Sequence, residues 1–191
     1  MTLTTNNVFT EQVHRYFDPI ATRFGMQCEV ETDNRVRFQN ETAFMEICFD
    51  SRRSREVSVN VGRIPISFDS SFDLTDVLRR YGYSDLKRVG ELRGDGADRL
   101  TAAVNLLSSL TLKYASSILS GSDSEVLAVR AFRNWASLKY AWETAKPASV
   151  IAAIKKLRTS PFYDEVVRTL DSHEREILRQ AQLLNETEGT P

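Results

Sequence analysis

Apolar residues alternate with polar ones along four stretches in the first third of the chain. An alternation of period two places every second side chain on one face, which is typical of β-strands with a single buried face. Short polar segments separate the stretches, so the pattern predicts a four-stranded antiparallel meander. The alternating residues are Met26, Cys28 and Val30, then Val36 and Phe38, then Ala43, Met45, Ile47 and Phe49, and finally Val57, Val59 and Val61.

The shared apolar face also predicts how the strands pair, because a slip of one residue would turn the apolar set of a strand toward solvent. In this register Val30 faces Val36, Val36 faces Met45, and Phe49 faces Val57. The turns between these pairs contain Asp33 and Asn34, Asn40 and Glu41, and Arg52 and Arg53.

Charged residues alternate in sign on the opposite face of the predicted sheet. Glu31 and Glu29 fall across from Arg35 and Arg37, and Arg35 falls across from Glu46. Cross-strand ion pairs contribute only about 0.2–1 kcal/mol each, so they indicate a solvated face and do not explain the stability of the sheet. We expect Arg35 to lie beside both Glu31 and Glu46, on the face opposite Met45 and Ile47.

Helical spacing of apolar residues precedes the sheet and returns after it. The fold class is therefore α+β, with an N-terminal helix on the four-stranded antiparallel meander and a mostly α-helical C-terminal half. The segment at residues 90–98 suggests a division into an α+β unit, 1–93, and a helical region, 94–191, packed as one compact domain. The predicted helices cover 10–24, 74–81, 99–119, 123–145, 147–157 and 160–184, with the pair 99–119 and 123–145 antiparallel.

Composition narrows the classes of protein that fit this fold. The chain has 191 residues, a net charge of −1, and no apolar run long enough to span a membrane, so we expect a cytoplasmic protein without membrane partners. A net charge near zero gives little nonspecific affinity for nucleic acid. Cys28 and Cys48 belong to no C-x-x-C pair, and we expect both to be small residues in or near the core.

No catalytic, cofactor-binding or metal-binding signature occurs in the sequence. The segment "HEREI" at 173–177 resembles the H-E-x-x-H zinc motif, but Ile177 occupies the position of the second histidine. "GDGAD" at 94–98 lacks the residues of a phosphate-binding loop. His14 has no partner at a recognisable spacing. We therefore predict no cofactor and no metal ion.

Arg52, Arg53 and Arg55 form the densest group of like charges, within the segment "FDSRRSREVS". Three interpretations are open: a solvated turn, a contact with an acidic protein partner, or a contact with nucleic acid. The segment has no glycine amides or interleaved aromatic residues, which phosphate and nucleic-acid sites use, so the solvated turn is favoured. Phe44 and Arg37, on the polar face of the sheet, complete the set of candidate partner contacts.

The segments "YFDPIATRFG", "AFMEICFDSRRSREVSVNVGR" and "FDLTDVLRRYG" resemble a style of small bacterial protein, some members of which look like immunity proteins or defence accessories. The resemblance covers the first half of the chain and implies binding to another protein, but it assigns no functional residue. We expect a non-enzymatic interaction module, such as an inhibitor, immunity protein or adaptor. The alternatives are an enzyme that uses carboxylates and arginines without a readable motif, and a weak nucleic-acid binder that uses the three arginines.

Overall fold

The computed structural model describes residues 5–188 and the side chains of residues 8–187. The chain divides into two compact units, and the division lies between Val126 and Leu127, within a helix, rather than near residue 94. The predicted fold class is confirmed: an N-terminal helix is followed by an antiparallel sheet and a mostly helical C-terminal half. Whether the two units pack as one domain stays a prediction.

Within residues 5–188 the sheet has five strands in the order β1-β2-β3-β4-β5, of which β1–β4 form the predicted meander. The added strand, β5, is only three residues long and precedes a short helix that Asp73 caps by accepting a hydrogen bond from the backbone N–H of Thr75. The strands are β1 (Gln27–Thr32), β2 (Arg35–Gln39), β3 (Ala43–Phe49), β4 (Val57–Arg63) and β5 (Ser71–Asp73).

The predicted register holds for one of the three pairings. Phe49 pairs with Val57 as expected. Val36 pairs with Ile47 instead of Met45, because the β2–β3 turn lies one residue later than predicted and Asn40 accepts hydrogen bonds from the backbone N–H groups of Thr42 and Ala43. The observed register differs from the predicted one by two residues, and because side chains alternate with period two, Val36 stays on the predicted face.

The β1–β2 pairing contains a β-bulge that the alternation did not predict. Cys28 pairs with Phe38, but the register shifts between Cys28 and Val30, so that Val30 pairs with Arg37 and Glu31 with Val36. An extra residue on one strand exchanges the faces of all residues beyond it. Glu31 therefore lies on the face of the sheet that carries the apolar residues, and the predicted pairing of Val30 with Val36 is wrong.

The bulge also changes the predicted ion pairs of Arg35. Arg35 lies on the face opposite Met45 and Ile47, as expected, and its Nε is 4.0 Å from Glu46 Oε2. Glu31 is on the other face, so the predicted contact between Arg35 and Glu31 is wrong. Arg37, rather than Arg35, is directly across from Glu46.

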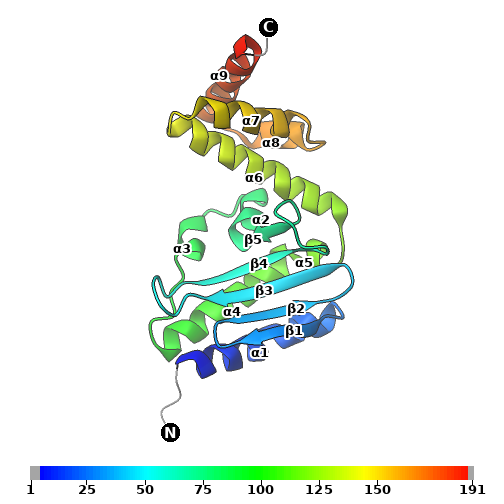
Figure 1. The fold of residues 1–191 in the computed structure, drawn as a ribbon, viewed down its shortest axis with the longest axis vertical. Coiled ribbons are helices and arrows are strands. Elements are labelled where there is room, and N and C mark those ends of the chain that lie inside the picture. Colours follow the sequence, from blue (N-terminus) through cyan, green and yellow to red (C-terminus); the bar gives the residue numbers. More distant parts are fainter. Residues whose placement is uncertain (1–4, 189–191) are drawn as a thin grey trace. The chain divides into compact units, whose positions relative to one another are not determined.

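Helices cover the apolar face of the sheet in the first unit (Figure 1). α1 (Thr5–Arg23) contacts β1 and β2, and it also packs along α4 (Ala97–Tyr114), which contacts β4. α5 (Ser116–Leu119) contacts β3 and β4. The helix predicted from residue 99 thus belongs to the core of the sheet unit. The buried sheet residues beneath these helices are Val36, Phe38, Met45, Ile47, Val59 and Val61.

Two shorter helices, α2 (Leu74–Arg80) and α3 (Leu86–Gly90), follow β5. The long helices predicted over 99–119 and 123–145 are present, the first as α4 and α5 with a break at Ala115, the second as α6 (Asp123–Glu143). Their antiparallel packing stays a prediction. No helix within residues 5–188 combines the length and apolar character needed to cross a membrane.

The second unit is helical and has its own core. Trp135 of α6 is 5% exposed, in a cluster with residues of α7 (Pro147–Arg158), α8 (Tyr163–Thr169) and α9 (Ser172–Glu188). α8 and α9 replace the single helix predicted over 160–184. The break follows from a capping box, in which Asp171 accepts from the backbone N–H of Glu174 and the Glu174 carboxylate accepts from that of Asp171.

Candidate functional site

The turn from Asp50 to Arg55, called here the arginine turn, is held together by a single carboxylate. Asp50 Oδ1 accepts hydrogen bonds from the backbone N–H groups of Arg52 and Arg53, and Oδ2 accepts from that of Ser54. The bonds from Arg53, Ser54 and Arg52 lower the pKa of Asp50 to about 2. The turn is therefore fixed by its own backbone, and its arginine side chains are not needed to hold it.

The side chains of Arg52 and Arg53 are exposed. Within the described part of the chain, neither guanidinium has a carboxylate at ion-pair distance. Arg55 differs, because its Nε lies 3.7 Å from Asp95 Oδ1 and its carbonyl accepts from the backbone N–H of Gly94. The arginine turn thus presents two unpaired cations to solvent and keeps a third beside the loop that precedes α4.

The other two candidate contacts, Phe44 and Arg37, do not join this surface. Phe44 lies at the far end of β3 from the turn and is 2% exposed, with the Arg37 guanidinium 5.8 Å from the centre of its ring. Arg37 donates to Glu46 Oε2 from both Nε, at 2.8 Å, and Nη2. Glu46 itself is 13% exposed. These residues form an internal ion pair over a covered ring.

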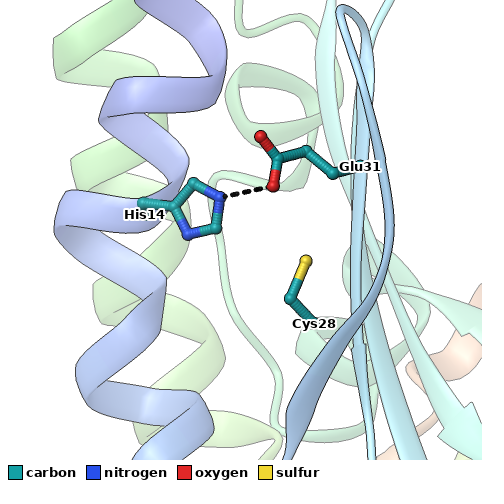
Figure 2. Close-up of side chains that lie close together, drawn as sticks. All are labelled: His14, Cys28 and Glu31. Carbon is teal, nitrogen blue, oxygen red and sulfur yellow. Dashed lines mark hydrogen bonds and ion pairs between the residues drawn. The ribbon is translucent and has the colours of Figure 1, made fainter.

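A second candidate group of side chains, which the sequence did not predict, lies between α1 and β1. His14 projects from α1 toward β1, where Glu31 and Cys28 point back toward it (Figure 2). His14 Nε2 is 3.2 Å from Glu31 Oε2, and His14 Nδ1 is 2.9 Å from Asp18 Oδ1, one helical turn further along α1. We call His14, Asp18, Cys28 and Glu31 the His14 cluster.

Packing against Phe38 fixes the orientation of the His14 ring. The edge of the ring meets Phe38, with 5.8 Å between ring centres and 81° between ring planes, and Phe38 is buried. Val13 and Phe17, the neighbours of His14 on the inner side of α1, are fully buried and hold the helix against the sheet. The cluster therefore rests on the core, although its polar atoms are open to solvent.

Opposing effects set the charge of His14. Burial of the ring lowers the pKa of His14, but the hydrogen bonds and charges of Asp18 and Glu31 outweigh it, so the pKa is raised above its ordinary value. A proton on each ring nitrogen then faces a carboxylate. In this state His14 is an imidazolium that joins the helix to the sheet edge.

The prediction that both cysteines lie in or near the core is wrong for Cys28 but agrees with Cys48. Cys28 is exposed at the edge of the sheet, and Cys48 is half-buried on the opposite face. Slight burial and the charges of Glu31, Asp18 and Glu29 raise the pKa of Cys28. Stronger burial, together with Glu46, raises the pKa of Cys48 to about 11. Both thiols are thus protonated and weakly nucleophilic in the absence of a cation.

The His14 cluster borders an open hollow of about 350 Å³ at the surface. Glu11, Glu31 and Asp33 line the hollow together with His14, and the described lining contains no lysine or arginine. The local field is therefore negative, in contrast to the field of the arginine turn. No sequence spacing could have revealed this site, because its residues come from two elements and Glu31 reaches it only through the bulge.

Comparison with known proteins gave no match of this chain to a family model, to a curated sequence or to a solved structure. The function is therefore inferred from the residues and geometry described above.

Proposed function

We propose that this protein is a non-enzymatic interaction module that binds the acidic surface of another protein through the arginine turn. The observation that carries the proposal is that Asp50 fixes the backbone of the turn while Arg52 and Arg53 have no acidic partner among the described residues. A rigid turn loses little conformational entropy on binding, so its exposed guanidinium groups are available to carboxylates of a partner.

The alternative of nucleic-acid binding has less support from the same residues. Besides its arginines, the turn has two side chains that make hydrogen bonds, Asp50 and Ser54, and these bind each other. No aromatic residue lies between Asp50 and Arg55 on which a base could stack. The alternative of an enzyme has one observation in its favour, which is the contact of His14 with two carboxylates. Both ring nitrogens are engaged there, so general base catalysis by His14 would first require release from a carboxylate.

Charge reversal of the turn tests the proposal. We would capture partners from the native organism with the wild-type chain, with Arg52→Glu/Arg53→Glu, and with Lys87→Glu/Arg88→Glu as a control. The control changes the charge by the same amount at two exposed neighbouring residues of α3. We expect an acidic protein to be retained by wild type and control and lost by the turn variant, with binding that weakens as salt increases.

Two results would contradict the proposal. Equal capture by both variants would show that the arginine turn is not the contact. Oligonucleotide binding that only the turn variant loses, measured by fluorescence anisotropy, would favour the nucleic-acid alternative, with a steep dependence on salt.

A further inference from the structure

We propose that His14, Cys28 and Glu31 bind one divalent transition-metal ion of the zinc type at the edge of the sheet. The inference goes beyond the proposed function, because it uses another part of the molecule and another chemistry. Neither proposal depends on the arginine turn and the cluster acting together, so each can fail without the other.

The spacing of the three ligand atoms fits such an ion. The imidazole nitrogen, the thiol sulfur and a carboxylate oxygen lie within 4.8 Å of one another (Figure 2). A tetrahedral zinc ion with bonds of about 2.1 Å to nitrogen and oxygen separates those two atoms by roughly 3.4 Å. His14 Nε2 and Glu31 Oε2 are already 3.2 Å apart. The sulfur of the exposed Cys28 lies within 4.8 Å of both atoms.

The hydrogen bond of His14 to Asp18 is an independent indication. Histidines that bind metals usually donate their second ring N–H to a carboxylate, which fixes the tautomer and the direction of the ring. Asp18 Oδ1 accepts from His14 Nδ1 at 2.9 Å, so that Nε2 is directed toward Glu31 and Cys28. Asp18 is thus placed as the positioning residue of the site, and the ion would take the place of the proton between Nε2 and Glu31.

The type of donor selects the type of ion. Calcium and magnesium prefer oxygen ligands, whereas nitrogen and sulfur donors favour zinc and its transition-metal neighbours. A thiolate and a carboxylate together offset the charge of a divalent cation. Glu11 and Asp33 at the hollow add negative field, and the described lining residues include no lysine or arginine.

The bulge in β1 makes the site possible. Residues three apart in a regular strand point to opposite faces, so Cys28 and Glu31 could not bind the same ion in an ideal β1. The register shift between Cys28 and Val30 places both on the side of α1. Three protein ligands leave one position of a tetrahedral ion for water or for an atom of a bound molecule, as in sites that exchange ligands.

Cobalt(II) provides a direct test, because it replaces zinc and gives a thiolate-to-metal charge-transfer band and strong visible bands in tetrahedral sites. We would titrate the full chain with Co²⁺, then with Zn²⁺, in a phosphine reductant, since a thiol reductant would itself bind the ion. We expect one Co²⁺ per chain with a charge-transfer band, and displacement of that band by Zn²⁺.

Matched variants identify the ligands. Cys28→Ser should abolish the charge-transfer band, whereas Cys48→Ser, at a half-buried thiol on the other face, should retain it. Asp18→Asn should keep the band but weaken Co²⁺ binding about 10–100-fold, the usual cost of losing a carboxylate behind a ligating histidine. Glu31→Gln should weaken binding, and Glu29→Gln should change it little.

Three outcomes would overturn the inference. The first is the absence of a charge-transfer band in the wild type at saturating Co²⁺. The second is a band that depends on Cys48 instead of Cys28. The third is equal Co²⁺ affinity of wild type, His14→Gln and Glu31→Gln, which would show an ion held by cysteine alone. Circular dichroism of each variant would test whether the fold is intact, and we expect it to be, because Cys28→Ser and Glu31→Gln change exposed side chains.

Discussion

The His14 cluster and the arginine turn are two charged regions of one sheet unit that are built in opposite ways. In the cluster, side chains from α1 and β1 bind one another, as His14 does with Asp18 and Glu31. In the turn, Asp50 binds the backbone of its own segment, and Arg52 and Arg53 extend into solvent. The difference teaches that a dense run of charges in a sequence and a convergence of functional groups in a structure are separate properties.

The largest expected effect concerns the packing under the cluster. Phe38→Ala should lower the free energy of unfolding by about 3–5 kcal/mol, because it empties a buried site. It should also move the His14 ring, which rests on Phe38. Urea unfolding measures the first effect, and the NMR signals of His14 report the second.

Trp135→Ala is the control for this variant. Trp135 is 5% exposed in the core of the second unit, so its loss should cost a similar amount without changing the His14 signals. Altered His14 signals in Trp135→Ala, or unchanged ones in Phe38→Ala, would show that the cluster does not depend on local packing.

A smaller effect is expected for the ion pair on the opposite face. Glu46→Ala leaves the half-buried guanidinium of Arg37 without its acceptor, and we expect a loss of about 1.5–3 kcal/mol, which is typical of hydrogen bonds to charged groups. Arg35→Ala should cost less than about 1 kcal/mol, because Arg35 is 47% exposed and 4.0 Å from Glu46. Equal losses in urea unfolding would contradict the ranking of these two pairs.

The arginine turn should respond to acid through Asp50. The folded pKa of about 2 lies below the ordinary 3.8, so the ionised carboxylate stabilises the fold above that range and the contribution is lost as pH falls toward about 2. Asp50→Asn should therefore be less stable than wild type near neutral pH, and the two should converge in acid. An Asp50 carboxyl carbon that titrates near 3.8 by NMR would contradict the bonding in the turn.

The smallest effect is expected for the arginines themselves. Arg52→Ala/Arg53→Ala should change the free energy of unfolding by no more than about 0.5 kcal/mol, since both side chains are exposed and Asp50 holds the turn through backbone groups. Thermal melts beside wild type would measure this. A clearly lower melting temperature would mean that the arginines stabilise the fold, and the comparison with the cluster would lose its basis.

The positions of the four meander strands, the fold class and the solvated character of the arginine turn could be predicted from the sequence, whereas β5 was missed. The pairing of Phe49 with Val57 was also predictable, because both neighbouring strands carry several apolar residues that only one register buries together. The β1–β2 pairing lacked that signal. Cys28 is exposed, Val30 is only half-buried, and the cross-strand charges used in their place contribute too little to determine a register.

Side-chain periodicity by itself determined that this chain forms an α+β fold with a meander and long helices, since strands and helices follow from local alternation and spacing. Only the tertiary structure decided that α4 belongs with the sheet, that β1 contains a bulge, and that His14, Cys28 and Glu31 meet. These features depend on contacts between residues distant in sequence, and a bulge such as the one in the edge strand β1 is frequent at the edge of a sheet. The residues of the cluster were visible in the sequence, but their proximity was not.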